Sequence, residues 1–204
     1  MPHTTTGRNK LLDSGKAAIT HLGAFTDLGV TEVTGGSYAR QAVTFAAASG
    51  AACSNSAQIS IPIPAGTTVP AIGAFDALTS GNILGFYPWG STGQVVVGVG
   101  IVDATGTDLI RSNGHGLTTD DRVMVWAANG EALPTGLSAS TLYYVLASGL
   151  TADAFKLSTS SGGAAVDITA LGELWFAKTV PNTFASAGNL VIAAGAFVLD
   201  LLRA

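Results

Sequence analysis

The chain has 204 residues, a net charge of −4 and only 11% charged residues, against about 25% in an average soluble protein. A chain of this length holds one β domain or two small ones. Its nine Lys and Arg residues are scattered, so no basic stripe can neutralise phosphates, which argues against nucleic acid as a partner. The longest apolar run, residues 190–199, is shorter than the roughly 20 residues of a membrane-spanning helix, which argues against membrane insertion.

Two further features of the composition bear on where the protein works. The few charges suggest that partner chains cover much of the surface; the alternative is a monomer whose exterior is rich in Ser and Thr. Cys53 is the only cysteine, so no intrachain disulfide can form and a small buried hydrophobe is expected. The N-terminus lacks the apolar core of a signal peptide, so we expect synthesis in the host cytoplasm without export by a signal of its own.

The N-terminal part of the chain predicts one helix followed by strands. The polar residues 1–7 predict an arm that is disordered in isolation. Apolar positions recur at helical spacing over residues 8–19, which predicts a short amphipathic helix, and residues 20–26 predict a strand. Residues 30–45 alternate apolar and polar side chains around a Gly-Gly pair, which predicts two strand halves with a turn or bulge between them.

The middle of the chain predicts more short strands. Residues 46–57 are rich in Ser, Ala and Gly and predict a loop. Strands with turn signals between them are predicted over residues 58–63, 69–76 and 82–87, and the prolines of the first place its end at a sheet edge. The pattern contains no crossover helices, so an antiparallel sandwich or barrel is expected.

The composition of the sequence changes at residues 88–93, which contain Pro, Gly, Ser and Thr. Beyond this point the pattern predicts short strands at residues 95–102, 109–111, 122–127, 142–146, 154–157 and 174–177. Residues 190–202 predict two closing strands. The predicted fold class is therefore all-β with one short N-terminal helix: an antiparallel sandwich or barrel domain with a second small β module inserted before its last strands.

Five segments together resemble a family of tailed-phage virion proteins described as tail fibre or head-decoration proteins. The segments are NKLLD at 9–13, ITHLGAFT at 19–26, EVTGGSYARQAVTF at 32–45, IPIPAGTTV at 61–69 and GNLVIAAGAFVLDL at 188–201. The resemblance extends over residues 8 to about 89 and again from about 183 to 202, and it departs from the family in a shorter loop at 27–31. It implies a small antiparallel β domain that occurs as a repeated surface subunit, and hence a homo-oligomer, with a trimer as one form.

A second resemblance covers residues 95 to about 178. The segments HGLTTDDRVMV at 115–125, LPTGLSASTLYYVL at 133–146 and LTADAFKLSTSSGGAAVDIT at 150–169 are similar to a β module of phage fibre and tail proteins. Of its adjacent Tyr143 and Tyr144, one is expected to point inward and one outward. The predicted domains are therefore 1–93 plus 180–204, which docks on the particle, and 94–179, an inserted module that projects from it.

No catalytic residue, cofactor site or metal site is predicted. Residues 98–103 begin like a dinucleotide fingerprint but lack its third glycine and its helix. The three histidines, His3, His21 and His115, share no ligand spacing; His115 is interpreted as a turn residue in preference to a base. Four aspartates could gather around a calcium ion, although capping turns and strand ends is the commoner use of such residues. They are Asp103, Asp108, Asp120 and Asp121.

The expected recognition surface is aromatic, because aromatic faces stack on sugars and anchor protein interfaces. The candidate interface or ligand contacts are Tyr38, Phe86, Tyr87, Trp89 and Trp126; the alternative is that these side chains fill two small cores. We expect a non-enzymatic bacteriophage structural protein of the virion, a capsid-decoration (head-fibre) or tail-fibre subunit, whose partners are copies of itself and the major capsid or tail protein. The alternative function is a receptor- or glycan-binding module at the tail tip, with a host surface glycan as its partner.

Overall fold

The computed structural model describes residues 4–27, 31–90, 93–94, 97–128 and 131–200. The chain divides into two compact units. Unit 1 takes residues 1–87, 91–94 and 182–204, and unit 2 takes residues 88–90 and 95–181.

The N-terminal helix α1 (Thr5–Gly15) begins three residues before the predicted start. The Thr4 side chain caps it by accepting a hydrogen bond from the Gly7 backbone N–H at 3.1 Å, which satisfies one of the donors that a first helical turn leaves open. Residues 5–7 are therefore helical rather than part of a disordered arm; residues 1–3 lie outside the described part of the chain. A 3₁₀ turn at Lys16–Ala18 follows the helix.

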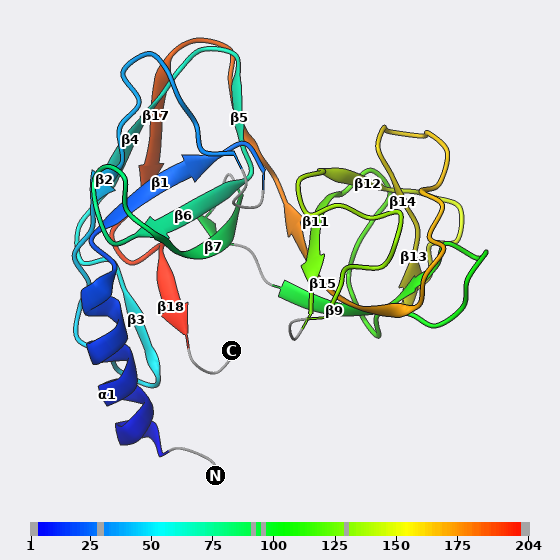
Figure 1. Cartoon of the computed structure of the whole chain (residues 1–204), viewed down its shortest axis with the longest axis horizontal. Helices are drawn as coiled ribbons and strands as arrows, with labels where there is room; N and C mark the ends of the chain where they lie inside the picture. The colour runs from blue at the N-terminus through cyan, green and yellow to red at the C-terminus, as the bar shows by residue number, and fades with distance from the viewer. Residues whose placement is uncertain (1–3, 28–30, 91–92, 95–96, 129–130, 201–204) are drawn as a thin grey trace. The chain divides into compact units, whose positions relative to one another are not determined.

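Unit 1 is organised around a five-stranded sheet with the order β2-β1-β6-β7-β8 (Figure 1). Its strands are β1 (His21–Phe25), β2 (Gln41–Ala42), β6 (Ala71–Phe75), β7 (Ile83–Gly90) and β8 (Gly93–Gln94). β1 and β6 pair antiparallel over five residues each, and Gly23 stands opposite Gly73. Both strands are buried on their two faces, which explains why neither shows the alternation of a half-exposed strand.

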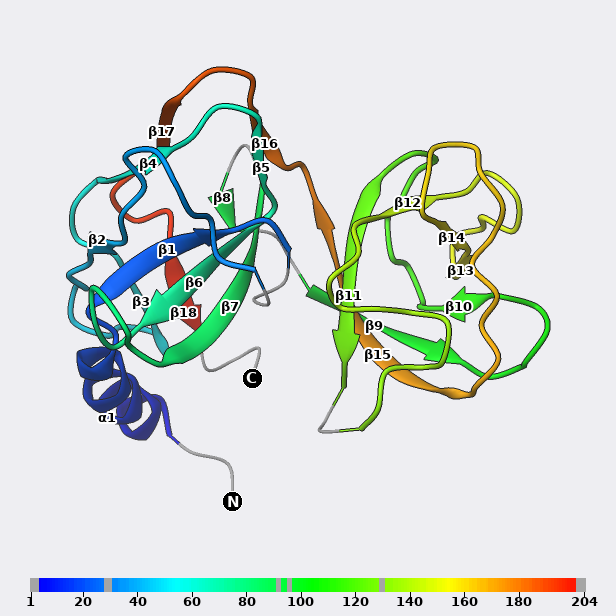
Figure 2. The same cartoon turned by 45° about the horizontal axis from the view of Figure 1, so that its top comes forward.

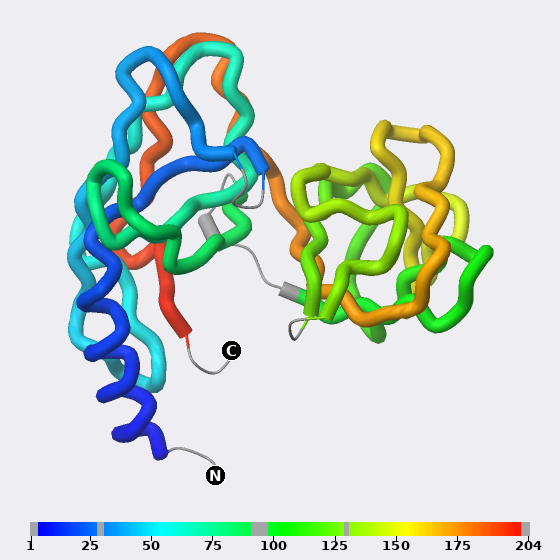
Figure 3. Tube along the Cα trace, in the orientation of Figure 1, coloured from blue at the N-terminus to red at the C-terminus, as the bar shows by residue number. Residues whose placement is uncertain are grey.

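The C-terminal part of unit 1 pairs with three earlier segments, which Figure 3 shows as orange-to-red chain beside cyan and green chain. The antiparallel pairs are β16 (Asn182–Phe184) with β5 (Thr67–Val69), β17 (Gly188–Ile192) with β4 (Ile59–Ile63), and β18 (Val198–Asp200) with β3 (Ala52–Ser54). The two predicted closing strands are β17 and β18; residues 201–202 lie outside the described residues.

β3 forms inside the segment that the sequence predicts to be a loop. Its partner comes from the far end of the chain, so no local pattern reveals it. Beside β3, the Asn55 side chain donates to the carbonyls of Ala57 at 2.8 Å and Ala193 at 2.9 Å, and it accepts from the Phe197 N–H at 2.9 Å. Asn55 is 1% exposed. One buried amide therefore ties the end of β3 to the connection between β17 and β18.

The strand halves predicted around the Gly-Gly pair are shorter than expected. Glu32 forms an isolated antiparallel bridge with Phe25, and regular pairing resumes only at the two-residue β2. Continuing the register of that bridge would place Gly35 opposite Leu22, but Gln41 stands there. Six extra residues therefore bulge out of this edge strand, as an unusually long β-bulge.

We call residues 31–40 the strap. The predicted turn lies within it, because Gly35 and Gly36 have φ of +85° and +56°, a region that glycine enters without steric penalty. The strand prediction for residues 30–45 is wrong in its extent because, beyond Val33, the strap bonds to the sheet through side chains rather than through a ladder. Residue 30 lies outside the described residues.

Unit 2 is built on a seven-stranded antiparallel sheet with the order β13-β10-β9-β15-β11-β12-β14 (Figure 2). Its strands are β9 (Val97–Val102), β10 (Ile110–Arg111), β11 (Arg122–Ala127), β12 (Tyr143–Val145), β13 (Ala154–Phe155), β14 (Leu157–Ser158) and β15 (Gly172–Thr179). The edge strands β13 and β14 are separated by Lys156 alone, so the sheet curls until its edges nearly meet. The result is a nearly closed barrel. Strands form where they are predicted, except that the strand predicted over residues 154–157 is broken at Lys156 into β13 and β14.

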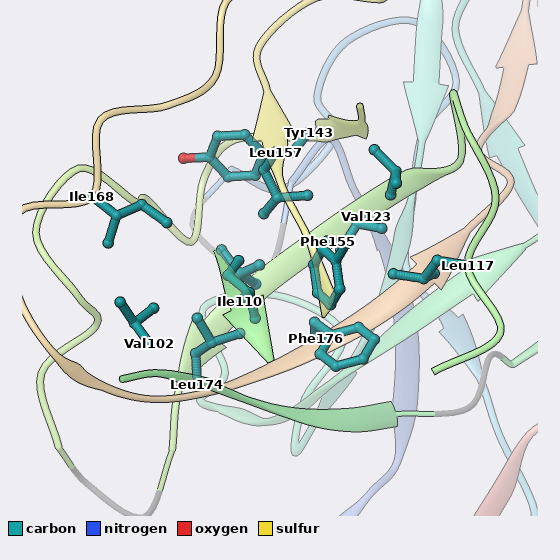
Figure 4. Close-up of a cluster of buried hydrophobic side chains, with 12 residues drawn as sticks. Val102, Ile110, Leu117, Val123, Tyr143, Phe155, Leu157, Ile168, Leu174 and Phe176 are labelled. Carbon is teal, nitrogen blue, oxygen red and sulfur yellow. The ribbon is translucent and has the colours of Figure 1, made fainter. Parts of the chain in front are cut away.

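The interior of unit 2 is filled by aliphatic and aromatic side chains (Figure 4). The Phe155 and Phe176 rings meet edge to face with centroids 5.1 Å apart. A Cβ added at Gly98 would lie 2.5 Å from Cζ of Phe176, and one at Gly100 would lie 2.5 Å from Cγ2 of Ile110. The Gly-Val-Gly sequence that begins like a dinucleotide fingerprint therefore makes room for core side chains.

The predicted orientation of the two adjacent tyrosines is confirmed. Tyr143 is buried in the interior of unit 2, and its hydroxyl accepts a hydrogen bond from the Ser138 N–H at 2.8 Å. Tyr144 points outward, and the Arg122 guanidinium lies 4.3 Å from the centroid of its ring. The predicted fold class, all-β with one short N-terminal helix and antiparallel sheets, is also confirmed. Among the described residues, no helix is long and apolar enough to cross a membrane.

Candidate functional site

The strap lies on the outer face of the β1–β6 pair and is held there by a polar network. Glu32 accepts from Tyr38 Oη and Arg40 Nε at its Oε1 and from Arg40 Nη2 at its Oε2, each at 2.8 Å. Arg40 Nη1 donates to the Ala77 carbonyl at 3.0 Å. The two parallel bonds between Arg40 and Glu32 are the strong, directional form of an ion pair, so the network fixes the strap on the sheet.

The Tyr38 hydroxyl also replaces a missing strand partner. Val33 N–H donates to the Ala24 carbonyl at 2.9 Å, as an edge strand would, but the strap lifts away beyond this point. The Ala24 N–H then donates to Tyr38 Oη at 3.0 Å. A buried backbone donor is costly when unpaired, so Tyr38 closes the gap that the six extra residues leave.

Two facing glycines let the strap and the aromatic rings approach the sheet closely. A Cβ on Gly23 would lie 2.7 Å from Tyr38 Oη, and one on Gly73 would lie 2.2 Å from Cε2 of Phe25. The Phe25 and Phe75 rings stack on this surface, with centroids 5.8 Å apart and an angle of 7° between the ring planes. The Arg40 guanidinium carbon lies 3.5 Å from the centroid of Phe75, which adds a cation–π attraction.

The electrostatics of the network stabilise its hydrogen bonds. Burial of Glu32 opposes its ionisation, but the hydrogen bonds from Arg40 and Tyr38 and the charge of Arg40 outweigh burial, so the pKa of Glu32 lies below its ordinary value of 4.5. Burial, followed by the hydrogen bond to Glu32, raises the pKa of Tyr38 well above its ordinary value. Tyr38 is therefore held as a neutral donor and Glu32 as a charged acceptor.

Replacing Glu32 by glutamine is expected to destabilise unit 1 by about 1–2 kcal/mol at neutral pH, because the charge-assisted bonds to Arg40 are lost. Since the folded state lowers the pKa of Glu32, its contribution is fully present above the unfolded value of 4.5 and disappears as the pH falls through the lower folded-state pKa. The stability difference between the parent and Glu32→Gln should therefore shrink in acid.

Urea unfolding at about pH 7 and about pH 3, followed by hydrogen exchange in β1, measures this difference. Glu131→Gln, which alters an exposed carboxylate of unit 2, is the control and should leave β1 unchanged. An equal stability gap at both pH values would contradict the role given to the Glu32 charge.

Beside the strap, the outer face of unit 1 is apolar and open. Phe86 of β7 contacts Phe25 edge to face, with centroids 5.7 Å apart, yet it remains 42% exposed, and Leu84, two residues earlier on the same face, is 45% exposed. Leu78 and Ile83, just before and at the start of β7, are also exposed. We call Leu84 and Phe86 the β7 face.

The sequence on either side of the β7 face carries almost no charge. Between Arg40 and Asp103, the sequence has a single charged residue, Asp76. Its carboxylate accepts from the backbone and side-chain nitrogens of Asn82, both at 2.7 Å. Hydrogen bonds from Asn82, opposed by slight burial, lower the pKa of Asp76. The one charge in this stretch of the sequence is therefore satisfied within unit 1.

The five candidate contact residues are divided between the two units. Tyr38 lies in the strap and Phe86 on the β7 face, whereas Tyr87 packs edge to face on Phe197, with centroids 4.7 Å apart. Trp89 and Trp126 belong to unit 2, and Trp89 is 2% exposed. Their roles as contacts stay predictions.

Unit 2 presents a second apolar surface on the outside of its barrel, where Val99 and Ile101 are exposed and Trp126 and Trp175 are half-buried. The register of β9, β15 and β11 aligns Val99, Trp175 and Trp126 in one row across three strands. Directly paired residues point to the same face of a sheet, and the flanking Phe176 faces the interior, so this row points outward. The centroids of the two indole rings lie 6.3 Å apart, and the angle between the ring planes is 60°.

The next row on this surface is apolar at its centre and charged at both sides. Ile101 pairs with Arg111 of β10 and with Glu173 of β15. Arg111 Nε forms an ion pair with Asp103 at 2.7 Å. We call Val99, Ile101, Trp126 and Trp175 the tryptophan strip; Val99 and Ile101 are 45% and 49% exposed. Trp175 completes the strip but is absent from the predicted contacts, because its position depends on a register that the sequence does not disclose.

The described residues considered for chemistry each have at least one structural partner, while Nε2 of His115 is buried without a hydrogen-bond partner and His3 lies outside the described part of the chain. His115 Nδ1 accepts from the Leu117 N–H at 3.0 Å, and its ring meets that of Phe155; His21 Nδ1 lies 2.8 Å from Thr20 Oγ1. The aspartates considered for calcium bond elsewhere: Asp103 to Arg111, Asp108 to the Ile168 N–H, Asp120 to Ser161 Oγ, and Asp121 to the Thr118 N–H and Lys178. Within the described part of the chain, no group of three or more His, Cys, Asp or Glu side chains could hold a metal ion.

Comparison with known proteins gives one match. Residues 17–107 are similar to the family described as podophage GP4 fiber I protein gp80. The matched residues contain the strap, the β7 face and β9, and they make up less than half of the chain. No curated protein and no solved structure matches the chain. The family match supports a phage structural protein of the fibre type, and hence a component of the virion.

Proposed function

We propose that this chain is a fibre-type structural subunit of a phage virion that assembles with copies of itself through the β7 face of unit 1. The observation that carries this proposal is an exposed pair of large apolar side chains, Leu84 and Phe86, in an almost uncharged part of the chain. Such surfaces on small domains mark sites of protein association.

The charges of unit 1 support a second copy as the occupant. Unit 1 has five basic and five acidic residues, so copies of it do not repel each other. Glu32 and Arg40 pair with each other, and Asp76 bonds to Asn82. A copy docked on the β7 face therefore buries few charges that lack a partner, which avoids a large cost of closing an interface.

Repetition strengthens such contacts without a large single interface. In a symmetric oligomer each contact recurs around the axis, and attachment at several points multiplies modest affinities. Unit 1 would attach this oligomer to the major capsid or tail protein. The function proposed is therefore assembly and not catalysis.

Quantitative mass spectrometry of purified phage particles tests the proposal. The chain should be present in washed particles at a fixed copy number that is a multiple of the oligomer size. Hundreds of copies would indicate capsid decoration or head fibres, and a handful would indicate a tail fibre. A chain that is abundant in infected cells but missing from particles would overturn the proposal.

A further inference from the structure

The tryptophan strip of unit 2 is a second surface that self-assembly of unit 1 does not use. Its central row, Val99, Trp175 and Trp126, crosses three adjacent strands. Strands in a sheet lie about 4.8 Å apart, so the row extends over about 10 Å. A surface that is narrow along the strands and long across them suits a chain-like ligand with flat ring units better than a compact molecule.

One kind of small barrel, the five-stranded OB-fold, binds two such ligands, oligonucleotides and oligosaccharides, across a sheet face. Both can stack on exposed aromatic rings. Single-stranded nucleic acid, however, also needs a positively charged groove that follows its backbone. Charge therefore decides between the two ligands.

Unit 2 carries the whole negative charge of the protein, with eight acidic and four basic residues. A phosphate backbone or an acidic polysaccharide would meet net repulsion at this unit. The same repulsion opposes a second copy of unit 2, since two acidic surfaces would face each other. A neutral oligosaccharide is not subject to this cost.

The charged groups beside the strip suit sugar hydroxyls. Arg111 and Glu173 stand on opposite sides of Ile101 on the outer face. A guanidinium donates hydrogen bonds and a carboxylate accepts them, so the pair can bond to hydroxyl groups in both directions. The apolar face of a sugar ring would then rest on the indoles.

We propose that the tryptophan strip binds a neutral oligosaccharide, which stacks on Trp126 and Trp175 and bonds through its hydroxyls to Arg111 and Glu173. This binding activity goes beyond assembly and does not depend on it.

The test uses the full-length chain on an array of neutral and acidic oligosaccharides, followed by titration of the best neutral ligand with tryptophan fluorescence as the readout. Trp126→Leu and Trp175→Leu keep apolar bulk but remove the aromatic face, and each should weaken binding on the order of tenfold. Glu173→Gln leaves both indoles in place and should also weaken binding. It tests the site if a tryptophan variant fails to fold. Val180→Ala, an exposed apolar residue beyond the end of β15, should bind like the parent.

Failure to bind any neutral oligosaccharide on the array would overturn the inference, as would binding only to acidic sugars or binding that the strip variants leave unchanged. A change in oligomer mass caused by Trp126→Leu would also overturn it, because the strip would then be a contact between copies. Loss of assembly in β7-face variants that still bind the sugar bears on the proposed function alone.

Discussion

Replacing Asn55 by aspartate is expected to destabilise unit 1 by about 3–5 kcal/mol, a large fraction of the roughly 5–15 kcal/mol by which an ordinary domain is stable. The new carboxylate would face the carbonyl oxygens of Ala57 and Ala193, to which the amide now donates. The site is 1% exposed, so water cannot take the place of the two lost bonds. The ends of β3 and β18 should separate together.

Unit 1 contains no tryptophan, because all three lie at positions 89, 126 and 175 in unit 2. Hydrogen exchange in β4 and β17 therefore reports unit 1, while tryptophan fluorescence reports unit 2. Asn113→Asp, the same substitution at an exposed position of unit 2, should change stability by less than about 0.5 kcal/mol. Normal hydrogen-exchange protection of β17 in the Asn55→Asp variant would show that the Asn55 amide does not hold β3 to the connection between β17 and β18.

Replacing Leu84 and Phe86 together by serine is expected to weaken self-association roughly a hundredfold or more, since a buried aromatic anchor at an interface contributes about 2 kcal/mol or more. Sedimentation velocity over a range of concentrations measures the change. Phe86 also contacts Phe25 within unit 1, so Leu84→Ser alone separates association from folding.

Val191→Ser is the matched control, because Val191 is 52% exposed on β17 of the same unit and lies outside the β7 face. It should assemble like the parent. If the double variant and Leu84→Ser have the same sedimentation profile as Val191→Ser and the parent, copies do not meet at the β7 face.

Strands with local signals could be predicted closely from the sequence. β11 has the predicted bounds, residues 122–127, because a β-branched and aromatic run there ends in turn residues on both sides. Tyr143 and Tyr144 follow the strand period of two. The short helix was also expected, although its Thr4 cap places its start earlier.

Features that depend on distant partners could not be predicted. β3 has an unremarkable Ala-Cys-Ser sequence and is a strand because β18 pairs with it. The strap has strand-like alternation, but the partners of Glu32 and Tyr38 are an arginine and a backbone N–H that no spacing rule connects.

The candidate contact residues also differ in how far local sequence could reveal their roles. Phe86 and Trp126 are predicted contacts because they are aromatic. Phe86 lies on the β7 face, and Trp126 lies in the tryptophan strip. Trp175 joins Trp126 only through the register of two strands far apart in sequence. Tyr87 was indistinguishable from Phe86 in the sequence, but strand alternation turns it toward Phe197.

Native mass spectrometry of the full-length, unmodified chain tests self-assembly most directly. If the neutral unit 1 covers its β7 face with another copy, the main species at micromolar concentration will have a mass that is a whole multiple, greater than one, of 20.4 kDa. A stable species of 20.4 kDa that persists as the concentration rises would contradict it.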